Sequence, residues 1–515
     1  MHSDKIGMVY LVGAGPGDPG LVTVRGLELI RRADCIVYDY LANEVFLQEA
    51  SPLAELLYVG KKGGDHTLPQ ADINRLIVDR ARAGLKVVRL KGGDPYVFGR
   101  GGEEAEELAA AGIPFEVVPG ISSAVAVPAY AGIPVTHRRY ASLVSFITGH
   151  EDPHKPESAI PWEVLAASPG TLVFLMGVKN LSEICQKLQA HGKAADTPAA
   201  VIHRGATPQQ KTVSGTLADI AGRVQTAGLT APAIFIVGGV VELRPRLNWY
   251  ETRPLWGKRI LVTRSRRQVS AFVKLLTEYG ATCLEAPTIE IAPPDDGYVA
   301  LDEAIQRLDR YQWLVFTSPN GVAAFFERLF GSGRDVRALG ACKLAAIGAA
   351  TAEALQEHGL IADVVPEDFR AEGLVASLSP LVRPGQLLLL PRAQEAREVL
   401  PQEMARQGVI VHVAPSYKTV PPAHLPPDTE SALARGEIDV LTFASSSTVT
   451  NFVRLIGLEH FKKLAAQAVI AAIGPITAKT LNQFGLEARI QPQTYTIPAL
   501  AAAIVDYFRT EAVRG

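Results

Sequence analysis

The stretch KVVRLKGGDPYVFGRGGEEAEEL, residues 86–108, says most about the fold of this chain. An apolar run, a glycine-rich turn and an acidic helical segment are typical of a strand, loop and helix in an α/β layer. Gly92 and Gly93 allow close backbone approach to a ligand, and Asp94 offers a carboxylate to hydroxyl or amine groups. Gly-Gly-Asp-Pro is also ordinary turn chemistry, so a purely structural turn stays open.

Two further turns follow the same pattern. MVYLVGAGPGDPG (8–20) has the Gly-x-Gly-x-Gly spacing of a dinucleotide turn, but Pro16 and Pro19 remove backbone N–H groups that a phosphate cradle needs. A nucleoside without phosphates would tolerate these prolines better. The third turn, within 117–139, carries hydroxyl and basic side chains. Its uncharged run 117–136 could span a bilayer by length, but its prolines and glycines predict a buried loop–helix–loop.

Composition narrows the class of protein. A length of 515 residues predicts about three or four domains. The net charge of 51 − 53 = −2 argues against nucleic-acid binding through global charge. The four cysteines lie far apart, which excludes a disulfide scaffold and gives no metal-site signature. No secretory signal opens the chain, and we expect a cytoplasmic protein without membrane or nucleic-acid partners.

The sequence RPRLNWYETRPLWG (244–257) marks the best domain boundary. We therefore expect one part at 1–245, split near residue 120, a linker at 246–257 and a second part at 258–515. Strand-like runs alternate with helical patterns in both parts, which predicts α/β layers with largely parallel sheets.

The second part contains an internal repeat. Residues 343–360 match 469–486 at nine of 18 positions with an offset of 126, and 317–329 return in weaker form at 444–456. Arg264 and Arg392 end corresponding strands. The repeat predicts two similar α/β lobes with a cleft between them. Hydroxyl-rich strand ends before helices suit carboxylates, although each could be a plain N-cap: Thr317, Ser318, Asn320, Ser445, Ser446, Ser447 and Thr477.

The first part resembles the uroporphyrinogen-III C-methyltransferases. The motifs that carry the resemblance occur in that family's order over residues 8 to about 250: VGAGPGDPGLVT, VYDYL, YVGKK, LKGGDPYVFGRGGEE, VVPGISSA, GIPVTHR, TGH, TLVFLMG and APAIFIVGGVV. The resemblance implies a two-domain tetrapyrrole methylase fold that binds S-adenosyl-L-methionine. It also implies two methylations of uroporphyrinogen III, at C2 and C7, which give precorrin-2, and a homodimer through this part.

The resemblance also implies roles for single residues. Asp39 would accept a proton and Lys61 would donate one, whereas the residues alone leave a helix cap and a solvated turn lysine open. Met176 would otherwise be core filler. The implied cofactor contacts are Pro16, Gly92, Gly93, Asp94, Val97, Ser122, Ser123, Met176 and Gly205. The basic residues suited to the substrate's carboxylates, or to a solvated surface, are Arg25, Arg100, His137, Arg138 and Arg139.

The second part resembles uroporphyrinogen-III synthase throughout, from KRILVTR through YQWLVFTSPNGVAAFF, LLPRAQEAREVL and PSYKT to IAAIGPITA. The resemblance implies a two-lobed, flavodoxin-like fold that cyclises hydroxymethylbilane with inversion of ring D and needs no cofactor. Tyr417 matches the family's tyrosine proposed to assist hydroxyl departure; an edge-strand tyrosine is the structural alternative. Arg264, Arg392 and Lys418 would help to hold carboxylates.

The leading hypothesis is therefore a bifunctional tetrapyrrole enzyme without a protein-bound metal. One alternative is an active methyltransferase fused to a non-catalytic tetrapyrrole-binding module. Another is an NAD-dependent dehydrogenase, which depends on Gly13-x-Gly15-x-Gly17 alone.

Overall fold

The structure is a computed structural model that describes residues 6–60, 68–150, 160–263, 266–420, 422 and 424–514. The chain divides into two compact units. The first unit is Met1–Lys258 with Leu276–Thr282 and Phe508–Gly515, and the second is Arg259–Leu275 with Cys283–Tyr507.

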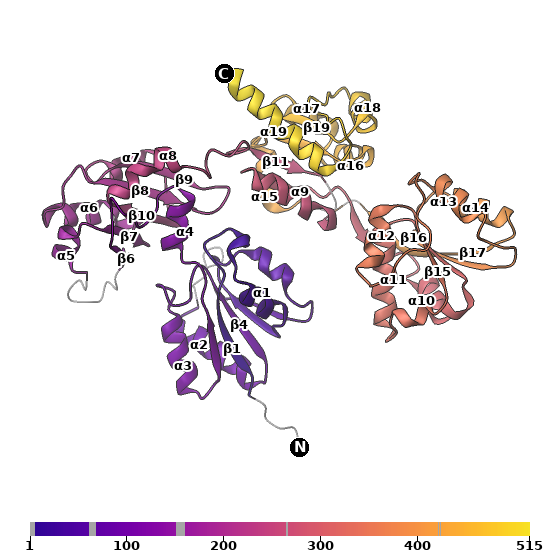
Figure 1. The fold of residues 1–515 in the computed structure, drawn as a ribbon, viewed down its shortest axis with the longest axis horizontal. Coiled ribbons are helices and arrows are strands. Elements are labelled where there is room, and N and C mark those ends of the chain that lie inside the picture. Colours follow the sequence, from indigo (N-terminus) through magenta and orange to yellow (C-terminus); the bar gives the residue numbers. More distant parts are fainter. Residues whose placement is uncertain are drawn as a thin grey trace. The chain divides into compact units, whose positions relative to one another are not determined.

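The first sheet is parallel throughout and has the order β3-β2-β4-β1-β5. Its strands are β1 (Met8–Gly13), β2 (Cys35–Tyr38), β3 (Glu55–Tyr58), β4 (Lys86–Lys91) and β5 (Phe115–Val118). Helix α1 (Val24–Arg31) covers one face, and α2 (Gln70–Arg82) and α3 (Gly101–Ala110) cover the other (Figure 1). Because the strands are parallel, their carboxyl ends and the turns that follow them lie at one edge.

The second sheet is mostly antiparallel, so the expectation of largely parallel sheets is wrong here. Its order is β6-β7-β10-β8-β9, and only β6 and β7 run parallel. The strands are β6 (Val144–Thr148), β7 (Thr171–Leu175), β8 (Pro198–His203), β9 (Lys211–Thr216) and β10 (Ala233–Val237). The short connection between β8 and β9 explains the difference, since parallel pairing needs a crossover of about a dozen residues or more.

Helix α4 (Ser123–Tyr130) packs its alanine and valine side chains against one face of this second sheet. The opposite face is covered by α5 (Trp162–Ala167), α6 (Leu181–Ala190) and α7 (Ile220–Thr226). The uncharged run 117–136 thus forms the end of β5, a loop and a short packed helix. Among the described residues, no helix is both long and apolar enough to cross a bilayer.

The second unit has two lobes. Lobe A is the sheet β13-β17-β16-β14-β15 with α10 (Val299–Gln306) to α14 (Val399–Arg406), and its strands are parallel except at β13. Along the chain, α10 and α14 are separated by α11 (Pro319–Gly331), α12 (Ala349–Gln356) and α13 (Ala371–Leu378). The strands are β13 (Glu290–Ala292), β14 (Trp313–Phe316), β15 (Lys343–Ala346), β16 (Leu387–Ala393) and β17 (Ile410–Val420).

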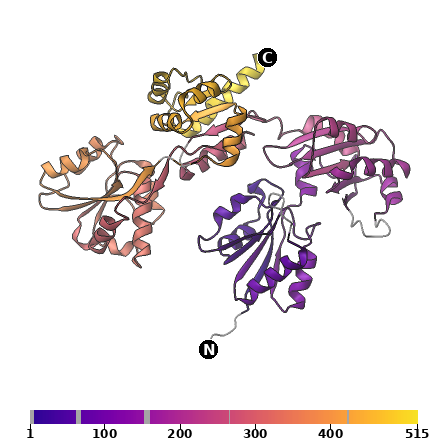
Figure 2. The same ribbon diagram turned by 180° about the vertical axis from the view of Figure 1, so that it is seen from behind.

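Lobe B is the sheet β12-β11-β18-β19 with its helices. Its strands are β11 (Arg259–Val262), β12 (Thr282–Glu285), β18 (Val440–Phe443) and β19 (Val469–Ala472). One face is covered by α15 (Pro427–Arg435), α16 (Ser446–Ile456), α17 (Leu458–Ala465) and α18 (Pro475–Gln483). Figure 2 shows lobe B in yellow and orange, with the magenta strand β11 contributed by a distant part of the chain.

The two copies of the repeat exchange strands. Strands β14 and β15 belong to the first copy and pair with each other, and β14 also pairs with β16 from the second copy in lobe A. Strand β11, from the first copy, pairs with β18 of the second copy in lobe B. Each lobe therefore contains segments of both copies, and the lobes are not successive halves of the sequence.

Candidate active sites

Glycine-lined turns meet at the carboxyl-end edge of the first sheet. Gly93 N donates to Gly15 O over 2.7 Å, and Gly15 N donates to Gly93 O over 3.2 Å. A Cβ atom at Gly13 would lie only 2.5 Å from Gly120 Cα. Gly93 adopts a φ of +69°, which favours glycine. The first, second and third turns are thereby held backbone against backbone.

Asp94 ties the second turn to the third. Its Oδ2 accepts from Gly120 N at 3.0 Å, and its Oδ1 accepts from Tyr96 N at 2.8 Å. Ser122 is the N-cap of α4 and accepts from Ala124 N, and Ser123 is the first residue of that helix. Asp94, Ser122 and Ser123 are thus brought together with Gly92 and Gly93, while Val97 lies in the same turn as Asp94.

The loop between β8 and β9 reaches the first turn. A Cβ atom at Gly17 would lie 2.7 Å from Thr207 Cγ2, so the two loops approach closely. Tyr130 Oη, at the end of α4, donates to Asp18 Oδ2 over 2.7 Å. Pro16, between Gly15 and Gly17, and Gly205 are therefore neighbours in the folded unit. Parts of the chain almost 190 residues apart contribute to one site.

Backbone strain is concentrated in these loops. Of the six non-glycine residues with positive φ in the described ranges, five lie within three residues of a predicted cofactor contact or, for Met176, are one: Phe98, Arg100, Met176, Arg204 and Ala206. Such conformations are costly and gather at functional sites. Met176, with a φ of +57°, is 51% exposed, so the alternative that it fills the core is wrong.

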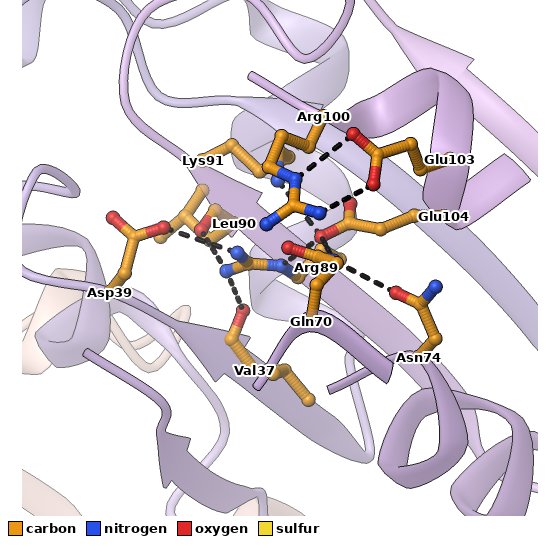
Figure 3. Close-up of polar contacts among 10 residues, drawn as sticks. All are labelled: Val37, Asp39, Gln70, Asn74, Arg89, Leu90, Lys91, Arg100, Glu103 and Glu104. Atoms are coloured by element: carbon orange, nitrogen blue, oxygen red, sulfur yellow. Dashed lines mark hydrogen bonds and ion pairs between the residues drawn. The ribbon is translucent and has the colours of Figure 1, made fainter. Parts of the chain in front are cut away.

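A buried charge network lies beneath the same edge (Figure 3). Glu104, on α3, accepts on its Oε1 from Arg89 Nε at 3.0 Å, Lys91 Nζ at 2.9 Å and Gln70 Nε2 at 3.2 Å. Arg89, Lys91 and Glu104 are all buried. Among the residues that the structure describes, Glu104 Oε2 finds no hydrogen-bond partner. Burial, and then the nearby Arg89 charge, lower the pKa of Lys91.

Asp39 joins this network from the end of β2. Its Oδ2 accepts from Arg89 Nη2 at 3.2 Å, and its Oδ1 accepts from Leu41 N at 3.1 Å. Asp39 caps no helix, because the next helical turn is capped by Asn43. Its partly exposed carboxylate is therefore held by a buried guanidinium (Figure 3).

The network was missed by sequence reasoning, although a signal for it exists. KVVRLK is an otherwise apolar strand in which Arg89 and Lys91 alternate with buried aliphatic residues. Charged side chains on a buried strand need partners, which predicts an acidic residue nearby. The sequence offers several acids in GGEEAEEL, and only the fold selects Glu104.

The predicted carboxylate-binding arginines have acidic partners. Arg25 makes a two-pronged contact with Glu116, both bonds at 3.0 Å, and Arg100 pairs with Glu103 at 2.9 and 2.6 Å. The glutamates raise the pKa of both arginines. These ion pairs are exposed, which agrees with the solvated-surface alternative.

The other basic candidates lie elsewhere in the chain. His137 N donates to Ala141 O in a tight loop that also holds Arg138, and Arg139 lies over the Tyr140 ring. Lys61 and Arg264 fall outside the described residues.

In lobe A, Tyr417 and Ser318 are brought together. Their hydroxyl oxygens lie 2.9 Å apart, and Ser318 also accepts from Gly321 N as the N-cap of α11. Tyr417 is 7% exposed and belongs to β17, which lies between β13 and β16. The edge-strand alternative for Tyr417 is therefore wrong. Thr317 precedes the cap and Asn320 is in the first turn of α11.

The corresponding hydroxyls of lobe B are also engaged locally. Ser445 is the N-cap of α16 and forms a capping box with Thr448, and Ser445 Oγ lies 2.9 Å from Ser447 Oγ. Ser446 donates to Ile476 O, which joins the starts of α16 and α18. Thr477 is buried. The N-cap interpretation thus holds for Ser318 and Ser445.

Two basic residues expected to hold carboxylates have partners in lobe A. Arg392 is buried, pairs with Glu398 and donates to Arg397 O at 3.0 Å. Lys418 pairs with Asp295 at 2.5 Å, which lowers the pKa of Asp295. Within the described ranges, no group of three or more histidine, cysteine or acidic side chains could hold a metal ion.

Two family profiles match the chain. Tetrapyrrole (corrin/porphyrin) methylases match residues 8–221, and uroporphyrinogen-III synthase HemD matches residues 270–502.

Several relatives are similar over long stretches. The porphyrin biosynthesis protein HemD of Ruminiclostridium josui is 37% identical over 93% of this chain and 94% of its own length. The uroporphyrinogen-III C-methyltransferase of Bacillus subtilis is 41% identical over 72% and 76%. The S-adenosyl-L-methionine-dependent uroporphyrinogen III methyltransferase of Methanosarcina barkeri is 56% identical over 48% and 98%.

Among solved structures, the uroporphyrin-III C-methyltransferase of Thermus thermophilus in complex with S-adenosyl homocysteine is 40% identical. It covers 46% of this chain and 94% of its own, with a TM-score of 0.40.

Proposed function

Since the chain belongs to the family that joins a tetrapyrrole methylase to a uroporphyrinogen-III synthase, we propose that it catalyses two consecutive steps. The second unit would close hydroxymethylbilane to uroporphyrinogen III with inversion of ring D. The first unit would methylate that product at C2 and C7 to give precorrin-2. The observation that carries the first assignment is the meeting of the three glycine-rich turns and the β8–β9 loop above the Asp39–Arg89 pair.

The residues at this edge fit S-adenosyl-L-methionine. The glycine-lined turns bring backbone close to any ligand, and Pro16 and Pro19 suit a cofactor without phosphates. We propose that the cofactor is held by Pro16, Gly92, Gly93, Asp94, Val97, Ser122, Ser123, Met176 and Gly205. When bound, this cofactor supplies an activated methyl group for an in-line displacement, so the protein's main contribution is positioning.

Asp39 would take the proton that the substrate loses after a pyrrole carbon has been methylated. Arg89 holds the Asp39 carboxylate in place, and the Leu41 backbone N–H fixes its second oxygen. The network below is buried, so Arg89 itself has little freedom to move. Lys61 is proposed as the proton donor from the resemblance alone.

We propose that Arg25, Arg100, His137 and Arg138 receive the carboxylates of the methylation substrate. Arg25 and Arg100 would exchange Glu116 and Glu103 for substrate groups, and both pairs are exposed enough for that exchange to cost little. The residues that would bind the bilane in the second unit are Thr317, Ser318, Asn320, Ser445, Ser446 and Thr477.

For ring closure, we propose that Tyr417 donates a proton to the departing hydroxyl. Ser318 holds the phenol hydroxyl, and α11 begins directly beyond Ser318. Loss of that hydroxyl as water requires a proton, and a phenol can supply one as a general acid. We also propose a cytoplasmic homodimer with tetrapyrroles as its small-molecule partners.

The test is a product analysis with purified protein and hydroxymethylbilane, with and without S-adenosyl-L-methionine. We expect uroporphyrin III after oxidation when the methyl donor is left out, and a dimethylated product when it is present. Uroporphyrin I alone would contradict ring closure with inversion. If supplied uroporphyrinogen III is methylated in that same preparation, the result would favour a methyltransferase fused to a non-catalytic tetrapyrrole-binding module.

A further inference from the structure

The internal repeat continues beyond the matching sequences at 343–360 and 469–486. Ala345 forms a parallel bridge with Val364, and Ala471 forms one with Ile490, again at an offset of 126. A buried proline follows two residues after each bridge, at 366 and 492. The same offset then makes Phe369 the counterpart of Tyr495.

Each of these aromatic rings lies against a glycine at the start of a helix. A Cβ atom at Gly348, the N-cap of α12, would lie 3.1 Å from Phe369 Cγ and Cδ1. At Gly474, the N-cap of α18, it would lie 3.0 Å from Tyr495 Cδ1. Both glycines are buried. The rings thus rest on backbone that has no side chain to separate them from it.

The remainder of each ring faces outward. Phe369 is 60% exposed and Tyr495 is 61% exposed. Single exposed apolar residues are common and need no explanation. Here, however, two large aromatic residues are exposed to the same extent at equivalent positions, on the same kind of glycine platform. The side chains next to them differ between the copies, as Arg370 and Thr496 do.

These rings lie at the sheet edges that carry the proposed ring-closure residues. In lobe A, β15 is the neighbour of β14, and Ile347 N donates to Phe316 O, so the turn holding Gly348 lies beside Ser318. In lobe B, Ile473 N donates to Phe443 O in the same way, beside Ser445. Carboxyl-end edges of parallel strands are where ligands bind in open α/β sheets.

We propose that Phe369 and Tyr495 each stack on a pyrrole ring of the linear tetrapyrrole, one from each lobe. The proposal rests on the proposed function of the second unit. A bilane presents flat, electron-rich rings whose carboxylates lie at the periphery. Hydroxyl and backbone N–H groups suit those carboxylates but leave the ring faces without a partner, and aromatic side chains complement such faces.

The test measures ring closure in the full-length chain without the methyl donor, so that methylation does not consume the product. We expect Phe369→Ala and Tyr495→Ala each to raise KM for hydroxymethylbilane by about three- to tenfold, with kcat changed less. Phe369→Tyr and Tyr495→Phe should keep the wild-type KM, because they keep the ring.

Ile361→Ala is the matched control. Ile361 is 80% exposed on the same lobe, but it lies near Asp363, whose backbone N–H donates to Leu344 O close to the amino end of β15, away from Gly348. An unchanged KM in both alanine variants would overturn the proposal while leaving wild-type turnover intact. A wild-type chain that forms no uroporphyrinogen III would overturn the proposed function as well. A KM change in Ile361→Ala equal to the others would show that exposed apolar area, not ring stacking, is being measured.

Discussion

At the residue scale, the charge network beneath the first sheet's edge depends on one buried atom, Glu104 Oε1. Three donors converge on Glu104 Oε1, two of them cationic, and Arg89 carries the contact onward to Asp39. Removing one partner of a buried ion pair leaves an uncompensated charge, which costs far more than losing an exposed pair. The neighbouring Glu103 supplies that comparison, since it pairs with Arg100 at the surface.

We expect Glu104→Gln to lower the free energy of unfolding of the first unit by about 3–5 kcal/mol. The matched variant Glu103→Gln should cost at most about 1 kcal/mol. Urea unfolding monitored by circular dichroism measures both. Equal losses in the two variants would contradict the buried network.

Asp39→Asn should impair methylation and leave ring closure unchanged. General base catalysis contributes about 10²–10⁴-fold, and asparagine keeps the size of the side chain but cannot take up a proton. The readout is methyl transfer from labelled S-adenosyl-L-methionine, with uroporphyrinogen III formation followed in parallel. Equal loss of both activities would contradict the division of labour between the units.

The lowered pKa of Lys91 predicts a pH dependence of stability. Because burial favours the neutral amine, the unfolded chain keeps this proton to a higher pH than the folded chain. Between the lowered pKa and the usual 10.5, the unfolded state binds more protons, so this group makes the free energy of unfolding rise with pH. Lys91→Met should flatten that rise in urea titrations at alkaline pH below 10.5. Identical slopes in the wild-type and Lys91→Met proteins would contradict this role of Lys91.

At the element scale, helix starts carry much of the second unit's chemistry. Ser318 caps α11 and also contacts the Tyr417 hydroxyl, so one hydroxyl orders a helix and a proposed acid together. Ser445 caps α16 in lobe B at an offset of 127 from Ser318, and its hydroxyl lies beside that of Ser447 instead. The two lobes therefore share a framework and differ in what their caps touch.

Ser318→Ala should therefore lose both stability and ring-closure activity. The missing cap costs about 1 kcal/mol, and the buried Tyr417 hydroxyl left without its serine adds about 1–3 kcal/mol. Tyr417→Phe should retain the cap and lose activity. Asp335→Ala removes the N-cap of the short helix Val336–Leu339 in the same lobe and should affect stability only. An active Tyr417→Phe variant would remove the tyrosine from the mechanism.

At the scale of the whole molecule, the division into two compact units predicts two unfolding transitions. A ligand stabilises only the folded state that it binds, by about 2.7 kcal/mol at 100 times Kd. We expect S-adenosyl homocysteine to raise one transition in differential scanning calorimetry and to leave the other in place. A single transition, or an equal shift of both, would contradict the separate assignment of the cofactor site.

The sequence alone predicted the fold class of this protein and its two joined enzyme types. Local patterns, such as the apolar run before GGDPYVFG and the helical segment after it, predicted the α/β class, and the recurrence of AIG at an offset of 126 predicted two similar lobes. The family matches confirm the joined methyltransferase and synthase. The local patterns succeed because a strand, its turn and the following helix are set by neighbouring residues. The predicted domain boundaries and residue roles stay predictions.

Only the tertiary structure decided which distant segments meet. Strand pairing is non-local, so nothing in the repeat revealed that β11 and β16 each pair with the other copy, or that the second sheet is mainly antiparallel. Charge pairing is equally non-local: Arg89 could have reached several acids, and the packing of α3 on β4 selected Glu104. Non-local packing also placed Phe369 and Tyr495 on their glycines. A ring can rest on backbone only where no Cβ atom intervenes.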